Sequence, residues 1–362
     1  MFKIYQKYII SNFILKFLNI SIIFFCLTII LGLLEEISFF KNLNVSALYP
    51  YFLTILNAPI TLFEIFPFIF LLTAQFLFYD FFKKEELNLL KKNGLSNLKI
   101  IKLLFLISLS MGIFTVLIYY NLASKLKFHY TSIKNDFSND NKYLAMVTDS
   151  GLWIKDEIND SILIIKSQYI EDNYLIKNMI NEFNSNFELK RTIQSNKIDI
   201  ENNTWILNDA IVFNPRNGVL EKNNFREYKI NSIYDFEKIN SLFKNFDTMS
   251  FLDLALNYKN LLNNGYSKPF LNQSLHSMLS MPFFLFLMTG LASILTMNTL
   301  KRSDNTRYII IGLLVSVVIF YFKDLSLALG QTNRIPLILS VWAPVIALSL
   351  FTSIGVIQIN EK

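Results

Sequence analysis

A polar block covering residues 121–267 divides the apolar part of this 362-residue chain into two groups of three segments. An α-helix rises about 1.5 Å per residue, so roughly 20 apolar residues cross the hydrocarbon core of a membrane. Six segments reach this length or come near it: 13–34, 51–82, 100–120, 279–300, 308–322 and 336–359. We therefore expect six membrane-spanning helices, with a large domain inserted between the third and the fourth.

Lys and Arg residues in the short connections are divided unequally between the two sides of the predicted bundle. One side holds twelve: Lys3, Lys7, Lys83, Lys84, Lys91, Lys92, Lys99, Lys102, Lys301, Arg302, Arg307 and Lys362. The other side holds three: Lys41, Lys323 and Arg334. Because short cytoplasmic loops are enriched in Lys and Arg, this pattern predicts cytoplasmic chain termini and an external polar block.

Charge and cysteine usage narrow what the polar block can be. Its acidic and basic residues nearly balance, so the net charge of +6 arises in the membrane half and reflects topology, not nucleic-acid binding. The single cysteine, Cys26, lies in the first apolar segment, so the external domain depends on its own core. That first segment is too long for a signal peptide and lacks a cleavage site, so we expect it to be retained.

The polar block is predicted to be mainly β-structure. Candidate strands cover residues 161–170, 198–201, 204–207, 210–213 and 219–230. Asn202-Asn203 favours a two-residue hairpin turn, and residues 214–218 form a second turn sequence. Short strands joined by turns indicate an antiparallel sandwich or roll, which a short helix from Ser250 to Gly265 would follow.

The second apolar segment contains Pro59 and Pro67, with Glu64 between them. Prolines kink membrane helices, and an ionisable side chain at membrane depth is costly if it faces lipid. Glu64 is therefore expected either to face protein or a cavity, or to lie near the outer interface.

The connection between the second and third segments is the best candidate for an interaction with another protein. Glu85 and Glu86 lie early and Lys91 and Lys92 lie late, an order that suits the dipole of a helix, and Gly94 can end one. The pattern predicts a short amphipathic helix. This helix is either a solvated loop helix or a lever that docks in the groove of a soluble partner.

The sequence offers little for chemistry within the chain itself. It has no G-x-x-x-x-G-K-[ST] phosphate-binding loop, and its two histidines, His129 and His276, form no recognisable metal or catalytic cluster. We expect no cofactor and no enzymatic activity here, so energy would come from a partner or a gradient. The few acidic residues in the spans weigh against a gradient-driven carrier.

Three cations on the external side oppose the charge asymmetry, namely Lys41, Lys323 and Arg334. They are candidates for contact with phosphates of a lipid head group. The alternatives are snorkelling to the interface, or pairing with nearby acidic residues: Glu35, Glu36 and Asp324.

The order of these features resembles the LptF/LptG permeases of the lipopolysaccharide exporter over nearly the whole chain. Members have six spans, a periplasmic β-jellyroll between the third and fourth, and a coupling helix with a Glu-(x)7-Gly pattern, a spacing that Glu86 and Gly94 keep. Several segments resemble the LptG branch: Gly151-Leu152-Trp153 at the start of the jellyroll, residues 197–207, the helix at 252–265, the Pro59-to-Pro67 spacing, and residues 320–324. The chain departs from that branch after the first span, where it has Glu35 and Glu36 and only Lys41.

The resemblance implies three regions: residues 1–121 with a coupling helix at about 83–94, a periplasmic jellyroll-like antiparallel β domain over 122–268, and residues 269–362. It implies an ABC exporter of the bacterial inner membrane, with an LptF-like second permease and a dimer of LptB-type ATPases that binds ATP and Mg. Lipopolysaccharide would pass through the jellyroll to LptC/LptA-type periplasmic proteins. The coupling residues implied are Glu85, Glu86, Leu90 and Gly94.

Two other functions share part of this pattern. One is a mechanotransmitting or sensor subunit that moves no lipid, and the other is a gradient-driven carrier. Capture of a lipid inside the β domain distinguishes export from sensing, and survival of transport after ATP depletion identifies a carrier.

Overall fold

The structure is a computed structural model that describes residues 3–41, 45–46, 48–137, 145–148, 151–158, 161–171, 173–184, 187–216, 219–236, 239, 248–263, 268–297, 305–332 and 334–361. The chain divides into two compact units. The helical unit comprises residues 1–130, 247–252 and 272–362, and the strand unit comprises residues 131–246 and 253–271.

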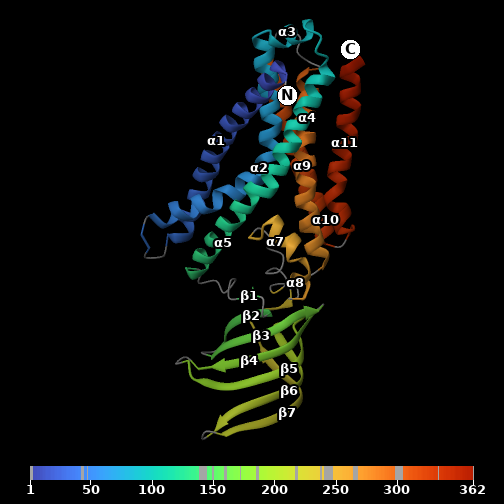
Figure 1. Ribbon diagram of the computed structural model, residues 1–362. Coiled ribbons are helices and arrows are strands. Elements are labelled where there is room, and N and C mark those ends of the chain that lie inside the picture. Colours follow the sequence, from blue (N-terminus) through green and yellow to red (C-terminus); the bar gives the residue numbers. More distant parts are fainter. Residues whose placement is uncertain are drawn as a thin grey trace. The chain divides into compact units, whose positions relative to one another are not determined.

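Six helices in the described ranges are long and apolar enough to cross a membrane (Figure 1). The third is continuous and combines α4 (Asn97–Phe114), a π-helical turn η1 (Thr115–Tyr119) and α5 (Tyr120–Asp136). The others are α1 (Ile4–Phe40), α2 (Leu48–Lys83), α9 (Lys268–Met297), α10 (Asn305–Gln331) and α11 (Leu337–Glu361). The predicted fold class, six spans with an inserted antiparallel β domain, is confirmed.

Two helices run further than hydropathy predicts. The fifth segment was expected to end at residue 322, but α10 continues through Lys323 and Asp324 to Gln331. The Lys323 ammonium lies 5.4 Å from the centre of the Phe284 ring, and this contact offsets part of the cost of a cation within the helix bundle. The third span likewise continues into the polar block, where Ala123 and Tyr130 of α5 are buried.

Aromatic side chains join α1 to α2. The rings of Phe17 and Phe70 lie 5.0 Å apart in an edge-to-face arrangement, and those of Phe24 and Phe68 lie 5.3 Å apart in the same way. Such pairs add about 0.5–1.5 kcal/mol beyond the area they bury. The first two spans therefore pack as a pair.

The third span contacts α2 at Pro59. The Tyr119 hydroxyl, at the end of η1, donates a 2.9 Å hydrogen bond to the Pro59 carbonyl oxygen. A hydroxyl bond between helices of this kind helps to hold them together in a membrane. The π-helical turn of the third span is therefore fixed to α2 at the level of Pro59.

The strand unit contains one seven-stranded antiparallel sheet in which each strand pairs with its neighbours in sequence (Figure 1). The strands are β1 (Ala145–Thr148), β2 (Gly151–Ile158), β3 (Ser161–Glu171), β4 (Tyr174–Phe183), β5 (Leu189–Asp199), β6 (Thr204–Arg216) and β7 (Val219–Asn231). Alternate residues of each strand face the core. One apolar row crosses five strands through direct cross-strand partners: Ile154, Ile165, Ile180, Ile193 and Val212.

Three local predictions in the polar block need correction. Asn202-Asn203 is not a two-residue turn with positive φ, because Ile200 enters the core and its N–H donates to the Asn173 carbonyl, which widens the loop. The turn at 214–218 is shorter than expected, since β6 runs to Arg216. The helix from Ser250 breaks into α7 (Phe251–Leu256) and α8 (Tyr258–Asn263), and Gly265 lies outside the described residues.

Candidate functional site

The connection between α2 and α4 contains the predicted short helix, α3 (Glu86–Lys92). Glu86 lies in its first turn and Lys91 and Lys92 in its last, which complements the helix dipole. Both ends are left-handed: Glu85 precedes the helix with φ of 56° and Gly94 follows it with φ of 82°. The left-handed residue at each end interrupts the helical backbone, so α3 is separate from both α2 and α4.

The leucines of α3 divide it into an anchored face and an exposed face. Leu87, together with Leu95 just beyond the helix, is buried, and Leu90 is half-buried. Leu89 is 56% exposed. The apolar residue that α3 presents outward is thus Leu89, whereas Leu90, the residue predicted from the family pattern, is partly covered.

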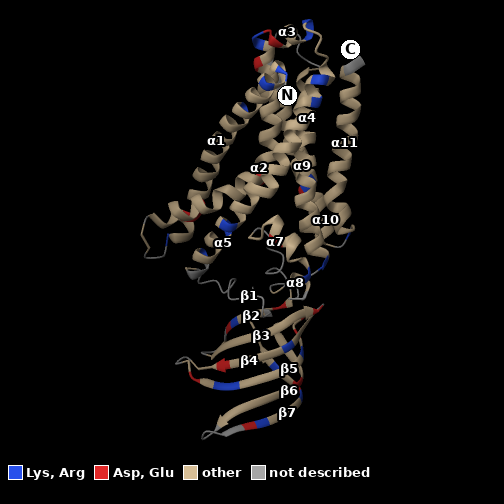
Figure 2. Ribbon diagram, in the orientation of Figure 1, with Lys and Arg blue, Asp and Glu red and all other residues tan. Residues whose placement is uncertain are grey.

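Charged residues gather around α3. Figure 1 places α3 and both ends of the chain at the same end of the helical unit. Figure 2 shows Lys and Arg concentrated at this end, while the middle of the bundle is largely without charge. The distribution agrees with the sequence-based division of the short loops.

A tyrosine from α1 reaches α3, a contact that the sequence did not reveal. The Tyr8 hydroxyl donates a 2.9 Å hydrogen bond to Oε2 of Glu86. The Tyr8 ring also stacks on Phe81 of α2, with centroids 6.0 Å apart and planes 15° apart. Tyr8 therefore contacts both the last turn of α2 and the first turn of α3.

An ion pair joins α1 to α2 further along the same interface. The Lys16 ammonium contacts the Asp80 carboxylate, and both side chains are about two-thirds buried. Charged groups within a membrane span are costly unless they are paired. This pair therefore fixes the register of α1 against α2.

Lys323, a predicted head-group contact, points into the helical unit. It borders a shallow hollow between α9, α10 and α11 whose other walls include Ser280, Phe284 and Pro344. The carboxylates of Asp324 and Glu64 both attract its ammonium group. Glu64, whose surroundings the sequence left open, is thus an exposed residue of α2 that belongs to a charge cluster with α10.

The other two predicted head-group contacts are exposed. Lys41 directly follows α1, and Arg334 lies in the turn between α10 and α11. The structure therefore distributes the three cations over separate positions and directs only Lys323 inward.

Polar side chains at the far end of α1 form a buried cluster. The Tyr130 hydroxyl of α5 donates a 2.7 Å hydrogen bond to Oε1 of Glu36, whose side chain is almost fully buried. The Lys127 ammonium donates to Oδ1 of Asn57 at 2.7 Å and lies 4.6 Å from the centre of the Tyr130 ring. Glu36 thus ties α1 to α5 where the LptG branch was expected to carry cations.

The three residues predicted at the start of the jellyroll begin β2. Gly151 pairs with Thr148 of β1, Leu152 is buried in the core, and Trp153 is half-buried. The Lys166 ammonium lies 4.9 Å from the centre of the Trp153 ring. The segment therefore contributes to the sheet and its core from its first residues.

A strap, residues 232–236, covers the inner face of the sheet. Tyr234 is buried, and Trp205 donates a 2.8 Å hydrogen bond from its indole N–H to the Tyr234 carbonyl. The buried Asp156 carboxylate accepts from the Ser232 hydroxyl at 2.7 Å and from the Ile233 N–H at 3.3 Å. The strap thus occupies part of the apolar interior and is held by polar bonds at its start.

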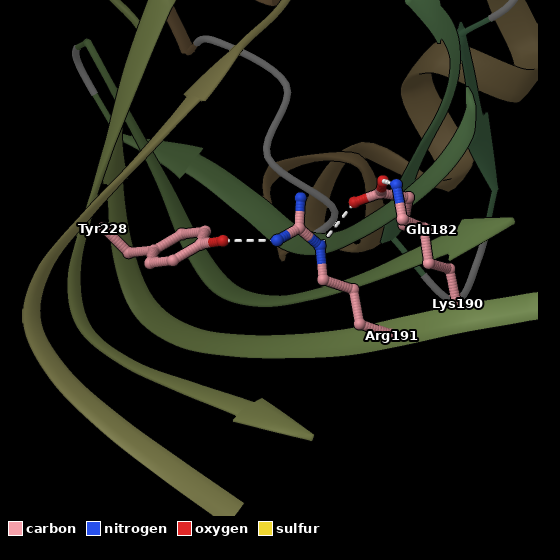
Figure 3. A network of polar contacts seen from close by, with 4 residues as sticks. All are labelled: Glu182, Lys190, Arg191 and Tyr228. Carbon is pink, nitrogen blue, oxygen red and sulfur yellow. Dashed lines mark hydrogen bonds and ion pairs between the residues drawn. The ribbon is translucent and has the colours of Figure 1, made fainter. Parts of the chain in front are cut away.

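A second polar group lies on the inner face (Figure 3). Arg191 donates from Nε to Oε2 of Glu182 at 2.5 Å and from Nη1 to the Tyr228 hydroxyl at 2.5 Å, and Lys190 also pairs with Glu182. Burial of Glu182 by itself raises the pKa of its carboxyl, but the bonds from Arg191 and Lys190 outweigh burial and hold that pKa below its usual value. The network links β4 to β5 and β7.

No metal site is evident in the described part of the chain, where no group of three or more His, Cys, Asp or Glu side chains could hold an ion. His276 accepts a 3.3 Å hydrogen bond at Nδ1 from the indole N–H of Trp342, which joins α9 to α11. The contact gives His276 a structural role between these two helices.

A family model described as lipopolysaccharide export system permease LptF/LptG matches residues 7–358. No curated protein matches the chain. The matched range contains α3, the whole sheet and four of the six candidate spans, and all but the outermost residues of the first and the sixth.

Proposed function

This chain belongs to the family of lipopolysaccharide export system permeases LptF/LptG, and from that premise we propose that it is one permease subunit of an ABC exporter. Its partners are an LptB-type ATPase dimer, an LptF-like second permease and LptC/LptA-type periplasmic proteins. The observation that carries the proposal is the family match over residues 7–358. The segment Gly151-Leu152-Trp153 favours the LptG branch for this chain.

The proposed link to the ATPase is α3. It is a separate element with an exposed leucine, Leu89, and a carboxylate, Glu86, in its first turn. A short amphipathic helix of this kind suits a groove in a soluble partner. Hydrolysis of ATP, with Mg bound in the partner, would move α3, so this chain needs no nucleotide site of its own.

The proposed orientation places α3 and both termini in the cytoplasm and the sheet in the periplasm of a cell with an inner membrane. The support is the charge at the α3 end of the helical unit, because short cytoplasmic loops are rich in Lys and Arg (Figure 2).

The proposed substrate contacts are Lys41 and Arg334 for phosphate groups and the apolar inner face of the sheet for acyl chains. Both cations are exposed, which suits a contact with a lipid head group. Lys323 is a weaker candidate, because Glu64 and Asp324 already attract it.

The test is purification of this chain from native membranes, followed by a transport assay. The proposal expects an associated ATPase and ATP-dependent release of lipopolysaccharide from vesicles that contain the complex. Glu86→Lys is expected to lose either the ATPase or the transport, because it places a cation where a carboxylate is proposed to meet the partner. Purification without any ATPase overturns the proposal.

A photocrosslinker on the inner face of the sheet separates export from sensing. Replacement of the exposed Met179 offers a matched control site on the same strand as the buried Ile180, whose side chain points to the opposite face. Lipid captured from position 180 and not from position 179 supports export. Capture of protein alone supports a sensor subunit.

A further inference from the structure

We infer that Tyr8 is a positioning residue through which movement of α3 is transmitted to α1. The inference rests on the function proposed above, in which α3 receives force from an ATPase.

The first step is the way α3 is connected. Short connections along the chain join α3 directly to α2 and α4, whereas α1 is separated from α3 in sequence by the whole of α2. In the described part of the chain, the side chains of α3 form one hydrogen bond with α1, the bond from Tyr8 to Glu86. Movement of α3 therefore reaches α1 directly at this point.

The second step is the double contact of Tyr8. Its hydroxyl binds the first turn of α3 at Glu86, while its ring is stacked on Phe81 in the last turn of α2. The stack fixes the ring in one plane, so the hydroxyl is directed at the carboxylate. A rigid aromatic side chain held in this way transmits a displacement better than a flexible one, because less of the displacement is absorbed by rotamer changes.

The third step is the freedom of α1 to respond. Only 17% of the apolar stretch of α1 is buried within the chain, against 78% for α9. The ion pair of Lys16 with Asp80 lies eight residues from Tyr8, about 12 Å along the helix at 1.5 Å per residue. A shift at Tyr8 would therefore move α1 together with the part of α2 on which Phe13 and Phe17 pack, against few other neighbours within the described chain.

The carboxylate of Glu86 can bind Tyr8 and the proposed ATPase partner at the same time. Tyr8 binds Oε2, and a carboxylate can accept at both oxygens. A cationic side chain of the ATPase can therefore bind Oε1 of Glu86 while the Tyr8 hydroxyl stays bound to Oε2. The two proposals therefore use different atoms of the same side chain.

The experiment compares the parent exporter complex with Tyr8→Phe in lipid vesicles that contain lipopolysaccharide. The substitution keeps the ring stack and removes the hydroxyl. We expect unchanged complex yield and unchanged ATP hydrolysis, with about two- to tenfold less lipopolysaccharide released per ATP, the range that corresponds to one lost hydrogen bond. Tyr5→Phe is the matched control, since the described contacts include no hydrogen bond of the Tyr5 hydroxyl, and it should equal the parent.

A distance measurement gives a second readout. In a Cys26→Ala background, spin labels at Ile4 and Leu89, both exposed, report the separation of α1 and α3. We expect a narrow distance distribution that is kept through the ATP cycle in the parent, and a broader one in Tyr8→Phe. The inference is overturned if Tyr8→Phe equals the parent both in lipopolysaccharide released per ATP and in the distance distribution between the two labels. A parent complex that releases no lipopolysaccharide contradicts the proposed function instead.

Discussion

The Ser108 hydroxyl of α4 donates a 2.8 Å hydrogen bond to the Thr289 hydroxyl of α9, although 181 residues separate them in sequence. Nearby, Gly112 lies against Pro282, so the helices before and after the inserted domain approach closely. Small residues and interhelical hydroxyl bonds are the usual means of helix association in membranes. The two helical triplets are therefore joined by backbone proximity at this level.

Gly112→Ala should destabilise the helical unit. A Cβ atom at this position would lie 2.8 Å from the Pro282 Cα, and backbone must move to accept it. We expect a loss of about 1–3 kcal/mol, as for other overpacked sites, seen as a lower thermal midpoint in detergent. Ser110→Ala is the control, because that exposed hydroxyl only bonds within its own helix. Equal midpoints for the two variants would contradict the close approach.

Gly94→Ala should loosen the end of α3. The residue has φ of 82° and no atom within 4 Å of a built Cβ, so the cost is one of backbone conformation alone. For an L-residue that cost is about 1–2 kcal/mol. Faster amide hydrogen exchange at Leu95, whose N–H bonds the Leu90 carbonyl, is the measurement. Gly94→Asn should be milder, because Asn tolerates this conformation.

Lys16→Asp should impair folding, and Asp80→Lys in the same chain should restore it. Either single change leaves two like charges facing each other between α1 and α2, whereas the exchange rebuilds the ion pair. The amount of monodisperse protein extracted from membranes is the measurement. A double variant no better than the single ones would exclude this pair as the reason for the loss.

Glu182→Gln should flatten the acid sensitivity of the sheet. Because its pKa is lowered in the folded state, Glu182 stabilises the sheet fully above its unfolded pKa of about 4.3, and this is lost as pH falls through the folded value. We expect the free energy of unfolding at pH 7 to fall by about 1.5–3 kcal/mol, which is typical for a bond between charged groups. The free energy of unfolding should also change less steeply with pH between about pH 5 and 3.

Tryptophan fluorescence can follow this change in the sheet alone. In a Trp342→Phe background the remaining tryptophans, Trp153 and Trp205, both lie in strands. Glu201→Gln, at an exposed loop position, should keep the slope of the parent. A slope in Glu182→Gln equal to that of the parent would rule out Glu182 as its source.

Trp205→Phe should release the strap. The substitution removes the indole N–H that binds the Tyr234 carbonyl and leaves that buried carbonyl without this donor. The expected cost is about 1–3 kcal/mol. Earlier proteolytic cleavage within residues 232–236 is the readout, with Trp153→Phe as a comparison on a half-buried tryptophan. Cleavage rates that match in both variants would show that the bond does not hold the strap.

The elements that local sequence determines were predictable, and contacts between distant elements were not. The spans follow from runs of apolar residues, and β3 and β7 follow from their strand-forming sequences and flanking turns, so these were placed close to where they occur. Only the last two residues of β5 were predicted as strand, and β6 was predicted as two separate strands. Glu86 was chosen for its spacing to Gly94, but its partner Tyr8 lies 78 residues away, and no pattern connects them.

The partners of charged residues within the helical unit were also not predictable from the sequence. Glu36 was considered as a partner for cations, yet it is buried against Tyr130, 94 residues away. Glu64 could not be assigned because its surroundings depend on where α10 packs. A buried carboxylate such as Glu36 violates the local rule that polar groups face water, and only the assembled helices show how the cost is offset.

The strap gives the sheet an occupant that is part of the same molecule. Two residues separate Tyr234 from the end of β7, so it competes with any apolar ligand at an effective concentration in the millimolar range, about that of a short tether. For acyl chains that bind this face as proposed, entry into the sheet is then an exchange reaction with Tyr234. Delivery of the incoming chain close by, or of several chains at once, would favour that exchange.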